Sequence, residues 1–451
     1  MKLFQKLLLA TTAIGVFSPI AVNASEVNLN DVSNYSQSEI DISNDSFKPI
    51  SSVNPLLAGG EGLESNTSVD FDTDSFSSTT TLDGKAVFVV GAVDGNLDLQ
   101  ETADGGTTTA TVSGVANVVT SKGKVEKQSE ALSFGYVYQM NLNTSFTGDD
   151  NLYVRLKSSD GFENFTSKPG NYHNEAGSHA SVLNVDKIWY TFPLGDKVTA
   201  TVGPKIENYY MLAASPSVYK PKVLKAFRFG GHGAAFGAST STGLGLKYEA
   251  DNGFASSITV NSKGAQGTKG FLTDQDTTKL NVMAAYTADN YHLSATYTSQ
   301  TGNFNAFHYY STDNIDGSDE HTGYALRAWF RPDETGTAVP SVSIGYDTMD
   351  LDLATAGYDN ASGYSIAFNW SDMFQADDTI GIAFGAPISG TDPDTSNSVK
   401  EDVDPFLWEA YYSFRPNDSI EITPGIFGGT DVRDDADDDI FGAVLTTVFR
   451  F

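Results

Sequence analysis

Residues 404–426 read DPFLWEAYYSFRPNDSIEITPGI, and the alternation of their side chains decides the fold. On either side of the turn 415–418, every second side chain is apolar: Phe406, Trp408, Ala410, Tyr412 and Phe414, then Ile420, Ile422, Pro424 and Ile426. The opposite parity holds Glu409, Ser413, Glu421 and Thr423. A period of two residues is typical of a β-strand whose two faces meet different surroundings. The stretch therefore predicts two antiparallel strands joined by a short turn.

The same alternation recurs in three earlier segments, residues 321–331, 361–370 and 378–385. Each carries aromatic side chains on its apolar face, as Tyr324 and Phe330 do in the first. Strands of about 9–11 residues with aromatic ends are typical of a barrel wall that faces a bilayer. A soluble β-sandwich alternates in the same way, so alternation alone leaves both folds open.

The lengths of the connecting segments distinguish the two folds. Short turns occur at 147–151, 193–196, 250–253, 287–290, 332–336, 371–377 and 415–418. They alternate with long polar segments at about 99–129, 159–181, 207–241, 263–278, 302–320, 351–360, 387–403 and 428–439. This asymmetry is typical of bacterial barrels, which keep their turns in the periplasm and their loops outside. We therefore predict an all-β fold, a transmembrane antiparallel β-barrel of about 16 strands within a range of roughly 14–18.

The predicted wall runs from about Leu82 to Phe451, and two segments leave its strand count open. The first is 99–129, where Thr107–Val119 could form an extra hairpin. The second is 207–241, the longest connector between two clear strands. An even number of strands places both ends of the barrel on the periplasmic side.

The first 24 residues have the pattern of a secretory signal peptide. Lys2 and Lys6 form the positive end, Leu7–Phe17 the apolar run, and Val22–Ala24 a small-residue cleavage site. The apolar run is shorter than the ~18 residues that a membrane-spanning helix needs. We expect three parts: 1–24 as the signal peptide, 25–75 as a flexible periplasmic segment, and 76–451 as the outer-membrane barrel.

The composition excludes several classes of function. The chain has 27 basic and 57 acidic residues and a net charge of −30, which argues against a nucleic-acid partner. It has no cysteine, which excludes thiolate metal sites and cysteine nucleophiles. Its six histidines lack the spacing of a zinc motif, and Gly237–Ser241 lacks the second glycine of a nucleophile elbow. We predict no enzyme activity, no catalytic residue and no cofactor.

The last strand carries a further signal. One parity holds Phe441, Ala443, Leu445, Thr447, Phe449 and Phe451, so the alternation ends on an aromatic residue. A terminal aromatic after an alternating strand resembles the signal by which assembly machinery recognises outer-membrane barrels. We therefore predict that Phe441, Leu445, Phe449 and Phe451 form a barrel-assembly signal.

Several stretches resemble cyanobacterial outer-membrane porins, which are relatives of the carbohydrate-selective porins and are also labelled iron-uptake porins. The stretches are Phe76–Phe88, Leu142–Asp149 with Leu152–Leu156, Phe192–Gly203, Ile422–Gly425 and Thr446–Phe451. The segment Glu26–Tyr35 is similar to the start of marine picocyanobacterial members. The resemblance implies a homotrimer in the outer membrane of a Gram-negative-type cyanobacterial cell, carrying carbohydrates or inorganic ions, including iron.

The chain departs from this family at one point. Members commonly carry a surface-layer-homology domain and a coiled coil before the barrel, and that domain would attach them to peptidoglycan. Residues 25–75 are too few for it, are rich in Ser, Asp and Asn, and show no heptad pattern. We therefore expect a flexible tail in its place.

Residues 207–241 form the third external loop, the one that commonly folds into the lumen of porins. This loop is the one distinctly basic segment of an acidic chain: it carries Lys220, Lys222, Lys225, Arg228 and His232, opposed by Glu207. We predict that these cations, together with Arg327 on the polar parity of its strand, line a constriction that favours anions or hydroxyl-rich solutes. Arg331 shares this parity but borders a turn.

Two alternatives stay open. The basic loop is equally compatible with a surface position, where its lysines would bind lipopolysaccharide phosphates or merely contact an acidic neighbour. The whole barrel is also compatible with a non-conducting adhesin or structural outer-membrane protein. The expected partners are therefore membrane lipid and lipopolysaccharide, small hydrophilic solutes, the barrel-assembly machinery and further copies of the chain.

Acidic clusters mark two of the long loops. One holds Asp431, Asp434, Asp435, Asp437, Asp438 and Asp439, and the other Asp392, Asp394, Glu401, Asp402 and Asp404. Carboxylates suit Ca²⁺, but this spacing matches no defined calcium loop. We expect a solvated acidic face and predict no metal site.

Overall fold

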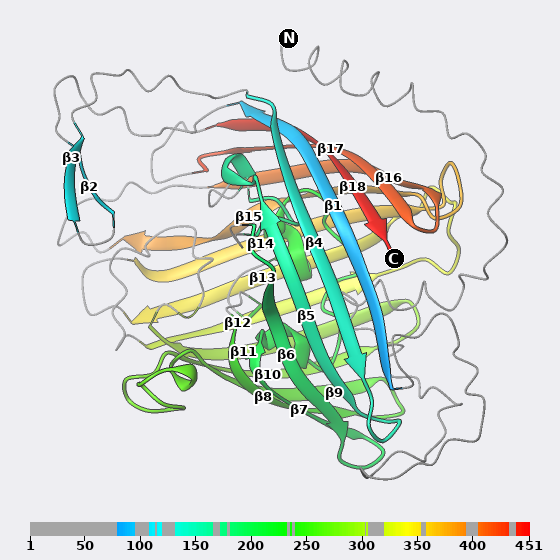
Figure 1. The fold of residues 1–451 in the computed structure, drawn as a ribbon. Coiled ribbons are helices and arrows are strands. Elements are labelled where there is room, and N and C mark those ends of the chain that lie inside the picture. Colours follow the sequence, from blue (N-terminus) through cyan, green and yellow to red (C-terminus); the bar gives the residue numbers. More distant parts are fainter. Residues whose placement is uncertain are drawn as a thin grey trace, which may run out of the picture.

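The structure is a computed structural model in which sixteen strands close into one barrel (Figure 1). It describes residues 79–94, 108–112, 115–119, 131–165, 172–177, 181–231, 235–236, 240–302, 304, 320–352, 358–393, 405–432 and 439–451. The signal-peptide and tail predictions for 1–75 lie outside these residues. No helix in the described part of the chain is both long and apolar enough to cross a membrane.

The barrel strands follow one another around the wall in chain order and are antiparallel throughout. The first eight are β1 (Thr80–Asp94), β4 (Ser133–Thr144), β5 (Asn151–Asp160), β6 (Asn184–Pro193), β7 (Val198–Ile206), β8 (Ser241–Glu249), β9 (Phe254–Ser262) and β10 (Thr278–Thr287). The others are β11 (Tyr291–Thr301), β12 (Glu320–Phe330), β13 (Ser341–Asp352), β14 (Tyr358–Ser371), β15 (Thr379–Pro393), β16 (Phe406–Asn417), β17 (Ile420–Thr430) and β18 (Ile440–Arg450). Strands β1 and β18 pair from Lys85↔Arg450 to Asp94↔Phe441 and so remove the sheet edges.

The predicted count of sixteen strands is confirmed. The extra hairpin considered for Thr107–Val119 is present, but it is not part of the barrel wall. Strands β2 (Thr108–Val112) and β3 (Val115–Val119) pair only with each other and do not enter the wall. Several strands extend into the predicted long connectors: β13 reaches Asp352, β14 begins at Tyr358, β15 reaches Pro393 and β17 reaches Thr430. Backbone pairing continues there although the apolar alternation has ended, because the bilayer no longer selects apolar side chains.

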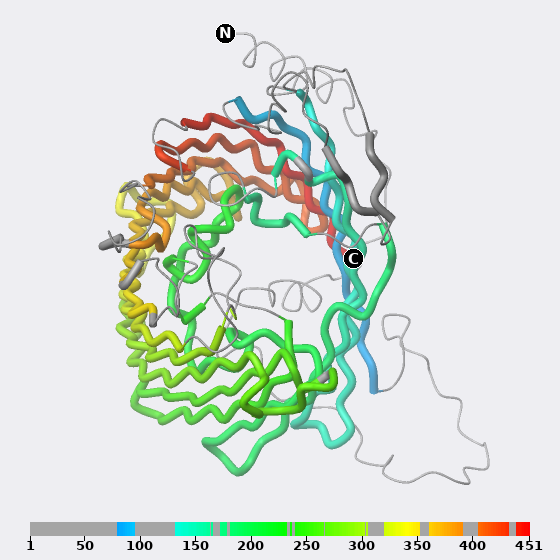
Figure 2. The backbone as a smooth tube through the Cα atoms, turned by 90° about the vertical axis from the view of Figure 1, so that its left-hand side faces the viewer, coloured from blue at the N-terminus to red at the C-terminus, as the bar shows by residue number. Residues whose placement is uncertain are grey.

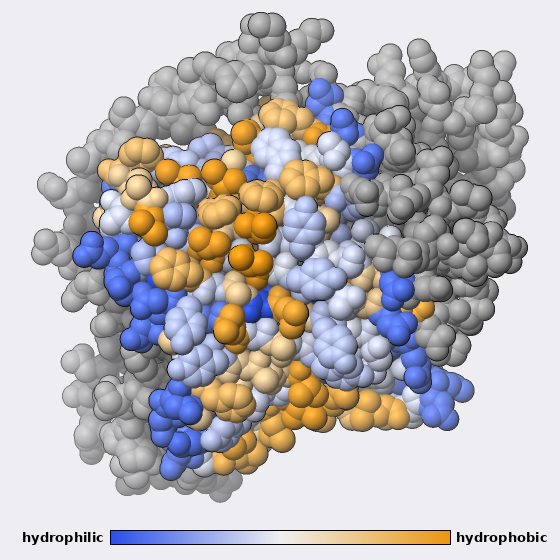
Figure 3. Space-filling model, turned by 180° about the vertical axis from the view of Figure 1, so that it is seen from behind, coloured by the Kyte–Doolittle hydropathy of each residue, from blue (hydrophilic) through white to orange (hydrophobic). Residues whose placement is uncertain are grey.

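The wall is apolar outside and polar inside. Along β12, Tyr324, Leu326 and Phe330 are exposed, whereas His321 and Arg327 are buried. Figure 3 shows apolar residues over the middle of the outer face and hydrophilic residues toward its left and right edges. This inversion of the usual protein pattern is what a barrel needs when lipid surrounds its outer face.

The last strand closes the barrel with its aromatic residues outward. Phe449 packs edge-on against Phe88 of β1, with ring centroids 5.4 Å apart, and Phe451 stacks on Tyr138 at 5.9 Å. The backbone of Phe451 exchanges two hydrogen bonds with Gly84, of 2.8 and 3.1 Å. The terminal residue is therefore fixed to the first strand by both backbone and ring contacts.

Candidate functional site

The connector after β7 lies against the inner face of the barrel. It contains two short 3₁₀ helices, η4 (Asn208–Met211) and η5 (Lys225–Gly230), and in Figure 2 its green trace lies inside the ring of strands. Its backbone meets inward-facing side chains of three strands. Ala213 N donates to Ser257 Oγ of β9 at 3.1 Å, Trp329 Nε1 of β12 donates to Ser215 O at 3.1 Å, and Tyr219 N donates to Ser343 Oγ of β13 at 3.2 Å. Residues 207–231 therefore cross the interior of the barrel, and the surface position considered above does not describe them.

A buried carboxylate on β16 holds the middle of this loop. Glu409 is 0% exposed, and it accepts hydrogen bonds from the Tyr219 hydroxyl at 2.6 Å and from Leu224 N at 2.5 Å. On the same strand, the Tyr411 hydroxyl donates to Lys220 O at 2.8 Å. Charge-assisted bonds to a carboxylate are among the stronger hydrogen bonds of proteins, so Glu409 fixes the loop's distance from the wall.

Arg327 holds the end of the loop. Its guanidinium donates to Phe229 O at 2.6 Å and to Gly231 O at 2.9 Å, and it pairs with Asp347 of β13 at 2.8 Å. The Phe236 ring covers it, with 4.7 Å between the guanidinium carbon and the ring centroid. Arg327 faces the interior, as its parity predicts, but it is only 3% exposed. It therefore anchors the loop, and the loop separates it from passing solute.

The loop and the wall lie in close contact at Gly345. A Cβ at this position of β13 would lie 1.6 Å from Gly230 O, so only glycine fits. Phe229, Gly230 and Gly231 have φ values of 58°, 71° and 117°, and this left-handed run lets the chain turn beneath the Arg327 guanidinium. Left-handed backbone is costly for a side chain such as Phe229, so the surrounding contacts hold it there.

A second segment, 172–177, folds inward beside the loop, and the sequence did not suggest it. His173 and Leu224 form an antiparallel bridge, Asn174 N donates to Val223 O at 2.7 Å, and Lys225 N donates to Tyr172 O at 2.9 Å. The segment reaches the wall through Glu175, which pairs with Lys85 of β1 at 2.8 Å. Two connectors therefore share the interior and support each other.

His173 is buried at the centre of this contact. Its Nδ1 accepts a hydrogen bond from Glu175 N at 3.1 Å, and its Nε2 lies 3.3 Å from Thr446 Oγ1 of β18. The pKa of His173 is lowered to about 4, mainly by burial and also by nearby Arg228, while Glu175 opposes the shift. The ring is therefore neutral near pH 7, with Nε2 as the donor to Thr446.

The predicted cations of the loop meet different partners. Lys222 Nζ lies 2.7 Å from Glu421 Oε1 of β17, Lys225 Nζ lies 4.6 Å from the centroid of the Tyr172 ring, and Arg228 donates to Asn174. Lys220, Lys222, Lys225 and Arg228 are all half-buried, whereas His232 lies outside the described residues.

Glu207, the acid expected to oppose these cations, is held elsewhere by Lys187 of β6 at 3.2 Å. Burial alone would raise the pKa of Glu207, but Lys187 and the Tyr209 hydroxyl outweigh it and lower that pKa to about 2.

An aromatic row fastens the first half of the loop. Successive ring centroids lie 4.2, 4.7, 4.6, 4.8 and 5.8 Å apart along Tyr153, Trp189, Tyr210, Tyr209, Phe229 and Phe236. Sugars stack on exposed aromatic faces, but these rings cover one another, and Tyr153, Trp189 and Tyr209 are 7%, 9% and 7% exposed. The row therefore packs the loop onto β5 and β6.

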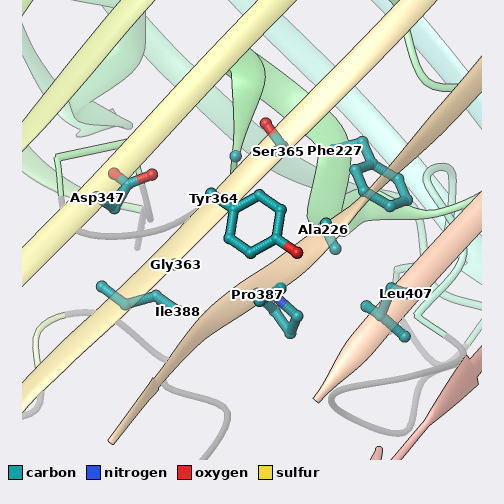
Figure 4. Close-up of a pocket in the computed structure, with 12 residues that line it drawn as sticks. Ala226, Phe227, Asp347, Gly363, Tyr364, Ser365, Pro387, Ile388 and Leu407 are labelled. Carbon is teal, nitrogen blue, oxygen red and sulfur yellow. The ribbon is translucent and has the colours of Figure 1, made fainter. Parts of the chain in front are cut away.

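A small pocket remains between η5 and strands β14 and β15. Phe227, Tyr364, Pro387, Ile388 and Leu407 give it mostly apolar walls (Figure 4). Its polar members include Asp347, which is already paired with Arg327, and Ser365. The pocket lacks the converging polar groups by which a hydrophilic solute would be bound.

The features of the barrel and its interior define a class of protein. A closed sixteen-stranded barrel with an apolar outer face, a polar inner face and an infolded connector is an outer-membrane porin. It is an integral outer-membrane protein that forms a passive diffusion channel.

In the described residues, no three metal-ligating side chains come together.

The family follows from the comparison with known proteins. The chain belongs to the carbohydrate-selective porin family, OprB, whose family model matches residues 56–449. The fold is shared with the high-pH structure of Pseudomonas putida OprB, at a TM-score of 0.55 and 12% sequence identity over 83% of this chain and 94% of that one. A triple mutant of the Rhodopseudomonas blastica porin aligns at a TM-score of 0.47 and 12% identity, over 82% of this chain and 100% of that one. No curated protein matches the chain.

Proposed function

We propose that this porin passes small hydrophilic solutes, namely carbohydrates and inorganic ions, and that residues 207–231 set its selectivity. The observation that carries the proposal is the course of the loop inside the barrel, because it brings four basic side chains to the inner face of the wall. Lys220, Lys222, Lys225 and Arg228 keep part of their surface exposed there. The name of the matched family, carbohydrate-selective porin, supports sugars as one class of solute.

The proposed selectivity has an electrostatic basis. Charged side chains on a constricted, low-dielectric wall act on a solute over a few ångströms with little screening. Lysine and arginine side chains there favour anions, and their N–H donors also suit the hydroxyl oxygens of sugars. The chain as a whole carries −30, so the loop would oppose the field of the rest of the protein.

The test is the reversal potential of the purified protein in a planar bilayer under a salt gradient. Lys225→Glu and Arg228→Glu should each shift the permeability ratio toward cations, because each replaces a positive charge by a negative one. Lys197→Glu is the matched control, since Lys197 pairs with Asp251 in an exposed turn outside the lumen. Unchanged reversal potentials in both loop variants would refute a selective role for the loop.

We propose further that the protein is exported with residues 1–24 as signal peptide, that 25–75 form a flexible periplasmic segment, and that 76–451 form the barrel. The resemblance to cyanobacterial porins supports a cyanobacterial outer membrane and a homotrimer, with lipopolysaccharide around the barrel. N-terminal sequencing of the membrane-extracted protein, and its mass in mild detergent, test these points.

The outward aromatic residues of the last strand support a role in assembly. Phe441, Leu445, Phe449 and Phe451 are proposed as the signal that the barrel-assembly machinery binds. Phe451→Ser should lower the amount of folded barrel in the membrane. Ser419→Ala, a change in a turn, should not.

A further inference from the structure

We propose that Lys222, Arg415 and Arg450 form an oxyanion-binding site at the turn end of the lumen, one that takes phosphate-bearing solutes. The inference deepens the proposed selectivity of the loop and rests on it for access from the lumen. The three side chains come from the infolded loop, from the end of β16 and from the end of β18. They meet at one carboxylate, Glu421 of β17.

Positive charge exceeds negative charge at this point. Glu421 Oε1 lies 2.7 Å from Lys222 Nζ, while Oε2 is shared between Arg450 Nη2 at 3.0 Å and Arg415 Nε at 3.6 Å. One carboxylate thus faces three cations. Glu175, the neighbouring acid on the infolded segment, is already paired with Lys85 and does not reduce the excess.

The cluster also has donors that Glu421 does not use. A guanidinium offers five N–H donors and an ammonium offers three. Arg450 Nη1 is buried and has no hydrogen-bond acceptor among the described atoms. A buried charged donor without an acceptor is rare in folded proteins, and a solute oxygen would supply that acceptor once the Arg450 side chain, which is 17% exposed, turns toward the water.

The three cations keep part of their surface accessible to water. The side chains of Lys222 and Arg415 are 27% and 25% exposed, and that of Arg450 is 17% exposed, whereas Glu421 is only 4% exposed. The cations therefore lie between the carboxylate and the water. Burial lowers the pKa of Lys222, and Arg450 and Lys220 lower it further, while Glu421 opposes the shift.

Geometry selects the class of ligand. Two guanidinium groups and one ammonium around a common point match the several oxygens of a phosphate, because Arg binds such groups with paired donors. Chloride also accepts hydrogen bonds from several directions, but it has only one acceptor atom and cannot pair separate oxygens with the two parallel N–H donors of a guanidinium. Arg450 N donates to Ser419 O at 2.7 Å, so the cluster lies beside the short turn after β16, which is periplasmic in barrels of this type.

The test is the current through single channels in potassium chloride at about 0.1 M, where screening is moderate. Inorganic phosphate replaces chloride at constant ionic strength and pH 8. We expect a saturable block that needs less phosphate from the turn side than from the loop side. Arg415→Gln and Lys222→Gln should raise the half-blocking concentration at least about tenfold, whereas Lys197→Gln should leave it unchanged.

Glu421→Gln separates a binding site from an ion network that only supports the wall. If phosphate competes with this carboxylate for the three cations, the current through the variant is blocked at a lower phosphate concentration than the current through the wild type. If the cluster only stabilises the wall, the variant shows no increase in its sensitivity to phosphate block. Heat-modifiable migration of each variant establishes that its barrel has folded. Arg415→Gln should disturb folding least, because Arg415 makes the longest of the three contacts with Glu421, at 3.6 Å.

The outcomes distinguish this site from the proposed selectivity. A block that is linear in phosphate and equal in all variants would overturn the site, even if the loop variants still shift the reversal potential. Saturable block that depends on Arg415, with no shift of reversal potential in Lys225→Glu or Arg228→Glu, would keep the site and overturn the selectivity role of the loop.

Discussion

The wall of the barrel and the loop inside it are specified in different ways. Strands β12 and β13 pair over eleven positions, from Glu320↔Asp352 to Phe330↔Val342. Each of these positions contributes a similar small share of the stability of the wall. The loop depends on a few side chains, chiefly Glu409, Arg327 and Lys222 with their partners. A single substitution should therefore leave the wall intact and displace the loop, which separates the folding of this protein from its selectivity.

The largest effect is expected from Arg327→Met. It leaves the Asp347 carboxylate buried without its partner, a change that costs about 3–5 kcal/mol where it has been measured in proteins. We expect the loop to leave the wall, with a noisier open channel and faster proteolysis between 207 and 231, while heat-modifiable migration persists. The double variant Arg327→Met with Asp347→Leu removes both charges and should recover part of the loss. Equal noise and proteolysis in wild type and Arg327→Met would show that the loop is held by other contacts.

A smaller but similar displacement is expected from Gly345→Ala. The new Cβ would lie 1.6 Å from Gly230 O, so the loop must move, whereas an alanine fits the strand itself. Gly323→Ala is the matched control on the neighbouring strand, since its Cβ meets Thr348 O at 2.6 Å and not the loop. The measurement is the single-channel conductance, which should change only for Gly345→Ala. The same change in both variants would place the effect in the wall.

A moderate effect is expected from pH through His173. Its pKa is lowered to about 4 by burial, against an ordinary value of 6.5 once the segment 172–177 leaves the wall. The undocked segment therefore binds the proton more readily, so docking weakens as pH falls from about 6.5 toward 4 and is unaffected above that window. Proteolysis of this segment should rise over the window in the wild type and much less in His173→Gln. If the pH profiles of proteolysis are parallel for the wild type and His173→Gln, groups other than His173 cause the effect.

The smallest effect is expected from Lys197→Gln. Its ion pair with Asp251 spans 2.6 Å, but the two side chains are 42% and 87% exposed, and such pairs contribute little because water and salt screen them. Conductance and heat-modifiable migration should match the wild type. A clear change in either would mean that turns at this end influence the lumen, and the contrast between wall and loop would need revision.

The sequence predicted the wall well because its rule is local. A two-residue period, aromatic ends and unequal connectors were enough for sixteen strands and for the inward parity of Arg327 and Glu409. The partners of the loop were out of reach, since Glu409 and Leu224 are 185 residues apart and Glu421 and Lys222 are 199 apart. One signal was available: charged residues in the middle of the inward parity of a strand, such as Glu409 and Asp347, need a partner when buried. The segment 172–177 carried no such signal.

The most direct test of the account is chemical modification inside the open channel. The chain has no cysteine, so Lys225→Cys introduces a single thiol against a silent wild-type background. A negatively charged thiol reagent added to the bath should lower the current stepwise, one step for each modified chain, and shift the reversal potential toward cation preference. Complete modification, verified by mass, with current and reversal potential unchanged would contradict the claim that this loop borders the path of the solute.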